Sequence, residues 1–390
     1  MKSFNLARIP ELIFGAGKIS VLPSILDRYG KNLLIVIGQR SFTESAQADL
    51  LFKNLKQQGF RWSVYKINNE PSAADIDRAV EQFKESKPDV VVAIGGGSVI
   101  DAGKAISAML VSPEKITTYL EVVGTQNPTG AKIPFIAIPT TSGTGSEATK
   151  NAVITNIGAN GFKSSLRHSN YIPDLALIDP ELQLNCPLQL TSCSGMDAFT
   201  QLLESYLSTE ANPITDSLAL DGINHICQSL VHLVKDDPHD IENRSKMAYA
   251  AWLSGITLAN AGLGTVHGFA SSVGSRFVIP HGVVCGSLMA ETNRITLKRL
   301  SNADNEKYFL NKYATVGRIL STKEDGSDAY FASSLIDSLF QMTNELNIPL
   351  LSEYGISRTD LDLIAENTSN KNNPVKLTTP DLKEILINRL

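Results

Sequence analysis

Short apolar runs alternate with helical patterns through the first half of the chain. The runs are bounded by turn residues, which is typical of buried strands. They fall at 32–37, 62–67, 90–94 and 133–138, with shorter candidates at 153–154 and 175–179. Apolar residues at helical spacing fill 48–58 and 75–84. This order predicts an α/β domain whose mostly parallel sheet is covered by helices on both faces.

The pattern changes after Pro180, where strand signals nearly vanish and long helical periodicities take over. The clearest helices are expected at 195–207, 213–234 and 243–259, with a polar loop at 366–374. We therefore expect an N-terminal α/β domain at residues 1–182 and an all-α domain at residues 183–390.

The segment 89–104 joins a strand, a glycine turn and a helix. Gly95, Gly96 and Gly97 allow the backbone to turn sharply and to approach a ligand closely. Residues 98–101 then open an apolar helix, whose free N–H groups and dipole favour an anion. We interpret this segment as a phosphate cradle. The alternative is a plain strand-to-helix turn, for which one glycine would suffice.

A second glycine-rich segment, 139–147, reads Pro-Thr-Thr-Ser-Gly-Thr-Gly-Ser-Glu and follows the strand at 133–138. Its hydroxyls and amides suit a second anion or polar ligand group at the carboxyl edge of a parallel sheet. A helix start capped by Thr144 or Ser146 is the other interpretation, and both can hold together. The loose dinucleotide patterns starting at Gly15 and Gly143 are treated as coincidental, because neither opens a first βαβ unit with an acidic partner.

Gly38 ends the first strong strand, where nucleotide-binding folds often carry an acidic residue for the ribose 2′-hydroxyl. No carboxylate stands there, and Arg40 and Ser41 follow closely. This pattern favours the 2′-phosphate of NADP over NAD. A simple surface turn is the alternative.

The predicted helical domain holds a second group of candidate residues. Asp197 and Gln201 are four residues apart and share one face of a helix. His267 and His281 stand in glycine-bordered turns just before helical segments. One carboxylate and two imidazoles are suitable ligands for Zn²⁺ or Fe²⁺. The alternative is a set of buried side chains that are merely hydrogen-bonded.

Composition narrows the class of protein. The 390 residues are 43% hydrophobic and 19% charged, as in ordinary globular proteins. The net charge of −5 and the lack of basic clusters argue against nucleic acid. No apolar stretch reaches the length of a membrane span, and the start is not followed by a signal-type core, so we expect a cytoplasmic protein. The four cysteines lack metal-type spacing and are expected to be reduced and mostly buried, with a catalytic cysteine as the disfavoured alternative.

Taken together, these motifs resemble the iron-containing alcohol dehydrogenase family, within the superfamily that also holds glycerol dehydrogenase and dehydroquinate synthase. The resemblance covers essentially the whole chain. It rests on the two glycine-rich segments above and on four short motifs and one segment: Phe14-Gly-Ala-Gly17, Leu177-Ile-Asp-Pro180, Met196-Asp-Ala198, the segment around His267, and Pro280-His-Gly282. Such enzymes transfer hydride between NAD(P)H and a carbonyl held on a divalent metal.

The resemblance implies roles for individual residues. The cofactor phosphates would face the cradle, at Gly95, Gly96, Gly97, Ser98 and Asp101. The rest of the cofactor groove would be lined by Thr140, Thr141, Thr144, Val153 and Lys163. Iron or zinc would be held by Asp197, His267 and His281. The implied substrate is a small alcohol, aldehyde or ketone, and we expect a homodimer or larger homo-oligomer.

Three departures separate this chain from the family pattern. Gln201 stands where a ligand histidine is usual, so it is expected to be a weak or absent ligand. Ser271 replaces a histidine of the usual proton relay, so proton exit could run through Ser271, the ribose and water. The late Asn-Pro-Arg reads Asn373-Pro374-Val375. Two alternatives on the same scaffold are a metal-independent reductase of the maleylacetate reductase type and a dehydroquinate synthase-like lyase. A non-catalytic nucleotide-binding protein is a third.

Overall fold

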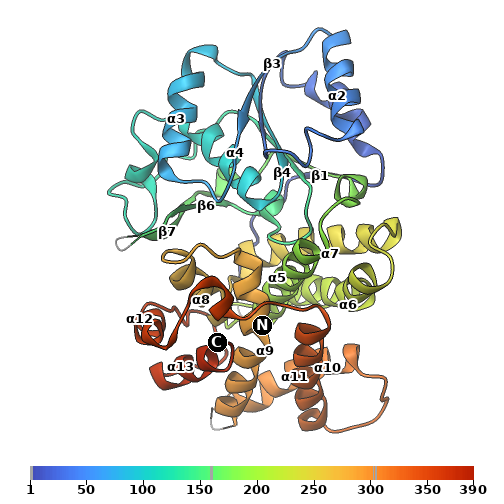
Figure 1. Ribbon diagram of the computed structural model, residues 1–390, viewed down its shortest axis with the longest axis vertical. Coiled ribbons are helices and arrows are strands. Elements are labelled where there is room, and N and C mark those ends of the chain that lie inside the picture. The colour runs from blue at the N-terminus through green and yellow to red at the C-terminus, as the bar shows by residue number, and fades with distance from the viewer. Residues whose placement is uncertain (1–2, 159–160, 302, 304) are drawn as a thin grey trace.

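The computed structural model describes residues 3–158, 161–301, 303 and 305–390, which form an α/β part followed by a helical part (Figure 1). Six strands make one sheet whose neighbours all run parallel. The strands are β1 (Glu11–Phe14), β2 (Asn32–Ile37), β3 (Arg61–Lys66), β4 (Val90–Gly95), β5 (Phe135–Pro139) and β8 (Leu175–Ile178). Their order across the sheet is β1-β8-β5-β4-β2-β3. The fold class predicted from the sequence is confirmed.

Helices cover both faces of this sheet because its central strands are apolar on both sides. The covering helices are α1 (Leu22–Leu26), α2 (Ala46–Gln57), α3 (Ala73–Phe83) and α4 (Gly97–Met109). On β2, Leu34 and Val36 join the core shared with α3 and α4, whereas Leu33 and Ile35 join the core shared with α1 and α2. Every residue of β4 and β5 is buried, as their unbroken apolar runs predict.

The second part of the described chain is helical, as predicted, and its helices share one large apolar core. They are α5 (Leu188–Tyr206), α6 (Pro213–Lys235), α7 (Ile241–Ala261), α8 (Thr265–Gly274), α9 (His281–Leu300), α10 (Glu306–Leu320), α11 (Asp328–Glu345), α12 (Leu361–Glu366) and α13 (Thr379–Ile387). Among the described residues, no helix combines the length and apolarity needed to cross a membrane. The exact division at residue 182 stays a prediction.

Two strands were missed. β1 is a short strand whose side chains are only half buried, so its apolar signal is weak. β6 (Asn151–Asn156) was expected only as a short candidate, and it pairs antiparallel with the missed β7 (Phe162–Arg167) in a hairpin outside the main sheet. β7 reads Phe-Lys-Ser-Ser-Leu-Arg, which carries only two apolar residues. The α5 helix also begins at Leu188, seven residues before the expected start.

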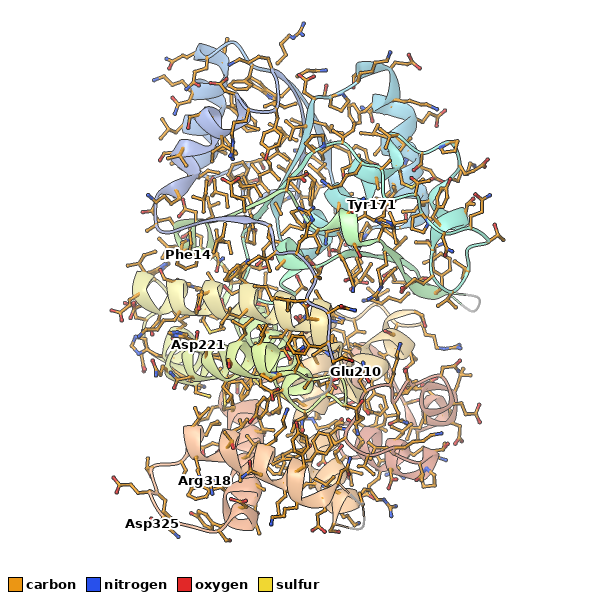
Figure 2. The ribbon with its side chains drawn as sticks, turned by 180° about the vertical axis from the view of Figure 1, so that it is seen from behind. Phe14, Tyr171, Glu210, Asp221, Arg318 and Asp325 are labelled. Atoms are coloured by element: carbon orange, nitrogen blue, oxygen red, sulfur yellow. The ribbon has the colours of Figure 1, made fainter. Side chains whose placement is uncertain are left out.

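The two parts meet along α5 and α7. Phe14, at the end of β1, packs edge-on against Tyr249 of α7, with ring centroids 6.2 Å apart (Figure 2). The loop after β5 also rests on α7, because Gly145 lies directly against Gly255: a Cβ added at Gly255 would lie 2.1 Å from the Gly145 carbonyl oxygen. Gly145 itself has a φ of 59°, which favours glycine. This close contact fixes the glycine-rich loop between the sheet and the helices.

Candidate functional site

A cleft of about 510 Å³ lies between the α/β part and the helical part. Most of the site residues expected from the sequence line it. From the α/β part these are Gly96, Gly97, Ser98, Asp101, Thr141, Thr144, Val153 and Lys163. From the helical part they are Asp197, Gln201, His267, Ser271 and His281. The structure therefore brings the two predicted groups together along one cavity.

The cradle at the start of α4 has backbone N–H groups without acceptors, and it has room beside Gly96. The N–H groups of Gly97 and Ser98 have no acceptor among the described residues, and no side chain caps the helix. A Cβ added at Gly95 or Gly97 would clash with the side chains of Val99 or Thr144, at 2.6 and 2.5 Å. At Gly96 the nearest atom would be 3.4 Å away. A side chain at Gly96 would therefore not clash with the fold, so packing does not explain this glycine, whereas a phosphate bound at the helix start would.

Asp101 lies beside the cradle in the cleft wall, and it also has a structural contact. Its Oδ2 accepts from the Val153 N–H at 3.0 Å, which ties β6 to α4, and its Oδ1 is buried with no partner among the described residues. Burial raises the pKa of this carboxyl, although Lys104 and the Val153 N–H oppose the rise. Asp101 thus lies in the cleft wall beside the cradle and holds the backbone of Val153 in place.

Lys104, from the same motif, is a buried structural cation. Its Nζ donates at 2.7–2.9 Å to the carbonyls of Ser146, Thr149 and Asn151 and to the Thr149 hydroxyl. Burial lowers its pKa to about 8. The lysine thereby fixes the loop after β5 and the start of β6 against α4.

The remaining predicted cofactor contacts divide into two groups. Gly95 and Thr140 lie behind the cleft wall and bond to each other through the Thr140 N–H and the Gly95 carbonyl, at 3.0 Å. Gly38, Arg40 and Ser41 follow β2 and are not among the residues that line the cleft. A side chain would fit at Gly38, where an added Cβ would meet only Val99, at 3.8 Å.

Several cleft residues on this side were not foreseen, and Glu70 and Asn151 are two of them. Glu70 binds the Lys163 Nζ with both carboxylate oxygens at 2.7 Å and accepts from the Thr155 hydroxyl. Asn151 lines the cleft with a buried Oδ1 that has no hydrogen-bond partner in the described chain. In the sequence, only its position just after the glycine-rich loop, at the start of β6, indicates that Asn151 lies near the cleft.

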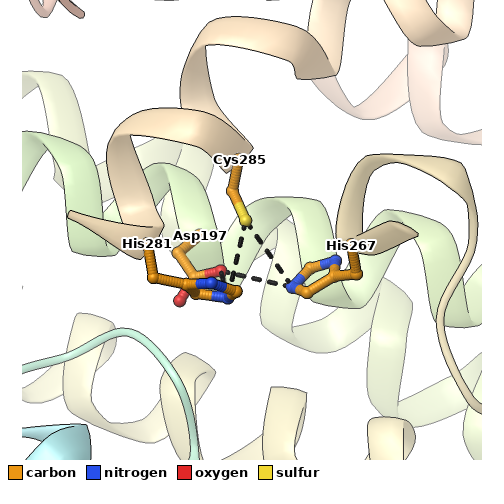
Figure 3. Close-up of side chains that lie close together, drawn as sticks. All are labelled: Asp197, His267, His281 and Cys285. Atoms are coloured by element: carbon orange, nitrogen blue, oxygen red, sulfur yellow. Dashed lines mark hydrogen bonds and ion pairs between the residues drawn. The ribbon is translucent and has the colours of Figure 1, made fainter. Parts of the chain in front are cut away.

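Three predicted ligands converge at the helical wall, joined by Cys285 (Figure 3). Asp197 Oδ1 lies 3.4 Å from His267 Nε2 and 3.6 Å from His281 Nε2. Cys285 Sγ lies 3.7 Å from each of these two nitrogens. Asp197 Oδ1 is buried and accepts no hydrogen bond from the described residues, so its contacts are the two longer ones to the imidazoles. Such a set of donor atoms fits a divalent metal ion.

Burial and neighbouring groups act in opposite directions on the ionisation of this cluster. Burial would lower the pKa of His267, but its contacts with Cys285, Asp197 and Glu204 reverse this and the pKa is raised. Burial lowers the pKa of His281 to about 4 and raises the pKa of Cys285 to about 12. Burial alone would also raise the pKa of Asp197, but the two imidazoles reverse this and the pKa is lowered. A neutral imidazole and a carboxylate are the forms in which both residues bind metals.

Glu204 orients His267 and was missed from the sequence. Its Oε2 lies 2.7 Å from His267 Nδ1, and the carboxylate also accepts from the N–H groups of Gly264 and Val266. With Nδ1 donating to Glu204, Nε2 is left as the metal-facing nitrogen. Glu204 lies seven residues after Asp197 on α5, so helical spacing could have identified it.

Gln201 lies on the same face of α5 as Asp197, as expected, but its amide is engaged elsewhere. Its Oε1 accepts from the Ser254 hydroxyl of α7 at 2.9 Å. Ser271 is exposed at the cleft, and its Oγ donates to the His267 carbonyl at 3.1 Å. All four cysteines are free, and Cys193 and Cys285 are buried. Cys285 stands four residues after His281 on α9. The spacing between the cysteines does not reveal this relation, because it joins a cysteine to a histidine.

The chain resembles known proteins over almost its whole length. A family model for iron-containing alcohol dehydrogenase matches residues 10–180, and one for the C-terminal domain of the Fe-containing alcohol dehydrogenase family matches residues 191–390. The chain is 33% identical to an NADPH-dependent butanol dehydrogenase of Clostridium saccharobutylicum, over 99% of this chain and 97% of the relative. It is 29% identical to an NAD-dependent methanol dehydrogenase of Bacillus methanolicus, over 98% of each. An alcohol dehydrogenase structure from Oenococcus oeni superposes over 100% of both chains, with 30% identity and a TM-score of 0.89.

Proposed function

Because the chain belongs to the iron-containing alcohol dehydrogenase family and is an NAD(P)-dependent oxidoreductase, we propose that it interconverts a small aliphatic alcohol and its carbonyl compound at the cleft described above. One observation carries this proposal. Residues of the phosphate cradle of α4, from the α/β part, and of the cluster around Asp197, from the helical part, line the same cavity. A dinucleotide bound at the cradle can therefore extend toward the cluster.

The chain's own residues have separate tasks in this reaction. The free N–H groups at the start of α4 bind the cofactor phosphates, and Asp197, His267 and His281 hold a divalent metal. When bound, the nicotinamide supplies hydride chemistry and the metal acts as a Lewis acid toward the substrate oxygen. Glu204 keeps His267 in one tautomer and orientation. Proton exit through Ser271, the ribose and water is part of the proposal, and the exposure of Ser271 at the cleft supports it.

The proposed substrate is small and largely apolar. Leu190, Leu258 and Leu263 line the cleft, and such side chains exclude water and accept an alkyl chain. Relatives are named for butanol, methanol and 1,3-propanediol, which fits this class. The relatives include both NADPH- and NAD-dependent enzymes, so the preference for NADP rests on Gly38 and Arg40 alone.

The proposal also includes the cellular location and the oligomeric state of the enzyme. Four free cysteines support a reducing compartment, and hence the cytoplasm. Phe4, Leu6 and Ile9 expose 39%, 46% and 49% of their surface on the N-terminal segment, which supports a homodimer or larger homo-oligomer. Light scattering of the purified protein measures its oligomeric state.

The deciding experiment measures metal content together with oxidation of NADPH and NADH across a panel of aldehydes and ketones. We expect one divalent ion per chain, turnover of short aliphatic aldehydes, and loss of turnover after treatment with a chelator. Full turnover by metal-free protein would favour the metal-independent reductase instead. Binding of dinucleotide without turnover of any substrate would point to a non-catalytic protein.

A further inference from the structure

The three metal ligands expected from the sequence, Asp197, His267 and His281, leave the fourth position of a tetrahedral metal ion without a clear ligand. Gln201, the residue at the usual position, has its amide oxygen engaged by Ser254, and the nitrogen at the other end of an amide is not a ligand. Cys285 instead reaches the open side of the cluster. Building on the proposed function, we propose that Cys285 Sγ is the fourth ligand, which gives an aspartate–histidine–histidine–cysteine metal site.

Four of the six distances between the four ligand atoms are close to the edges of a tetrahedral site, and the other two are no longer than 4.8 Å. With zinc bonds of roughly 2.1 Å to nitrogen or oxygen and 2.3 Å to sulfur, the tetrahedral edges are about 3.4 Å between two nitrogen or oxygen ligands and about 3.6 Å between nitrogen and sulfur. The two carboxylate–imidazole distances are 3.4 and 3.6 Å, and both thiol–imidazole distances are 3.7 Å. All four atoms lie within 4.8 Å of one another. One ion can therefore contact all of them with little movement.

The fold holds the Cys285 side chain beside the other three proposed ligands. It lies one helical turn after His281 on α9, so both side chains project from one face. It is fully buried, and α9 is fixed beneath it because Gly286 packs against Met196 of α5. Its thiol contacts both imidazoles, and Asp197 Oδ1, which accepts no hydrogen bond from the described residues, lies in the same cluster. On metal binding the S–H proton passes to solvent as the sulfur–metal bond forms.

Most nitrogen and oxygen sites already bind Zn²⁺ more tightly than Fe²⁺, and a thiolate ligand strengthens this preference. Sulfur is a softer ligand than the imidazole nitrogen usual at the fourth position, and soft ligands favour zinc over iron among the two candidate ions. The site therefore retains Zn²⁺ more strongly than Fe²⁺. Competition dialysis of metal-free protein against equal concentrations of the two ions, under reducing and oxygen-free conditions, measures this preference directly.

The first test replaces the metal with Co²⁺ in the full-length protein. A thiolate ligand gives an intense near-ultraviolet sulfur-to-cobalt charge-transfer band, which nitrogen and oxygen ligands do not. We expect this band in the wild type and in a Cys227→Ala control, whose cysteine lies on α6 away from the cluster. It should vanish in Cys285→Ala and Cys285→Ser, and metal affinity should fall by more than the roughly 10–100-fold that loss of an outer-shell partner costs.

A second test needs no substitution. X-ray absorption at the zinc edge is recorded for zinc-loaded wild-type protein, and the fine structure is fitted for a sulfur neighbour at roughly 2.3 Å. We expect one sulfur ligand beside nitrogen and oxygen ligands. One Co²⁺ per chain without the band, together with a zinc spectrum that shows no sulfur neighbour, would overturn the thiolate ligand while leaving the metal enzyme intact. No metal bound by the wild type, with chelator-insensitive turnover, would overturn the metal-dependent function itself.

Discussion

Single residues in the cradle are glycine for different reasons. Gly95 and Gly97 are enclosed by Val99 and Thr144, so a side chain at either position would disturb the packing. Gly96 has room for a Cβ in the protein alone. Its lack of a side chain is explained by the ligand that must approach the backbone there. The same motif thus contains structural and ligand-dependent glycines, which sequence patterns alone do not separate.

Gly96→Ala tests this distinction. The added methyl fits the fold but occupies the space of the phosphate, so the dissociation constant for NADPH should rise by about tenfold or more, an energy of roughly 1.4 kcal/mol. Fluorescence titration measures it, and the urea unfolding midpoint should stay near the wild-type value. Gly97→Ala is the contrasting variant, since its methyl meets Thr144 and should lower stability as well. Unchanged affinity in Gly96→Ala would argue against a phosphate at this position.

Gly38→Asp tests the cofactor preference. An aspartate fits sterically at the end of β2, where it would accept from the ribose 2′-hydroxyl of NAD and repel a 2′-phosphate. The ratio of kcat/KM for NADPH to that for NADH should fall by about tenfold or more, with metal content unchanged. A wild-type enzyme that already strongly prefers NADH would contradict the assignment to Gly38 and Arg40.

At the level of elements, one buried lysine fixes the loop that forms much of the cleft. Lys104 of α4 satisfies three backbone carbonyls from the loop after β5 and from β6, at 2.7–2.9 Å. Glu147 of the same loop is buried nearby, and burial raises its pKa to about 7. The stability of this loop should therefore depend on pH through a carboxyl that the reaction does not use.

Glu147→Gln isolates that dependence. In the unfolded chain the carboxyl ionises at its ordinary pKa of 4.5, whereas the folded protein keeps the proton up to about pH 7. Its contribution to stability is therefore complete below pH 4.5 and is lost as pH rises through 7, by at most about 1.4 kcal/mol per pH unit. Urea unfolding of both proteins from about pH 4.5 to about pH 8 should show a flatter profile for the variant. Parallel profiles would mean that Glu147 is ionised in the folded protein.

Periodicity predicted the elements that are apolar and central, but not those at the edges. The strands β2, β4 and β5 follow directly from unbroken apolar runs, because both of their faces are buried. The hairpin partner β7 is largely polar, and its pairing with β6 depends on tertiary contacts. The site shows the same limit. Asp197 and the two histidines were found as residue types in turns and helices. Helical spacing puts Glu204 on the face of Asp197 and Cys285 on the face of His281, but their contacts with His267 depend on how α5, α8 and α9 pack together.

At the level of the whole molecule, function depends on how the two parts are held against each other. The cofactor cradle belongs to the sheet, and the metal cluster belongs to the helices. The backbones of Gly145 and Gly255 touch at this junction, and Phe14 packs on Tyr249 beside it. The spacing between cradle and cluster is therefore set by a contact that includes neither of them, and in a hydride-transfer enzyme that spacing decides the rate.

Gly255→Ala tests this dependence, because its methyl would lie 2.1 Å from the Gly145 carbonyl and must push the loop away from α7. We expect stability to fall by about 1–3 kcal/mol and kcat to fall by roughly tenfold or more, with metal content unchanged, since none of the four cluster residues moves with the loop. Gly222→Ala is the matched control: its methyl would lie 2.8 Å from the Leu202 side chain, inside the helical part. That variant should lose stability but keep its kcat. Equal losses of kcat in both variants would show that turnover follows general stability rather than the spacing of the two parts.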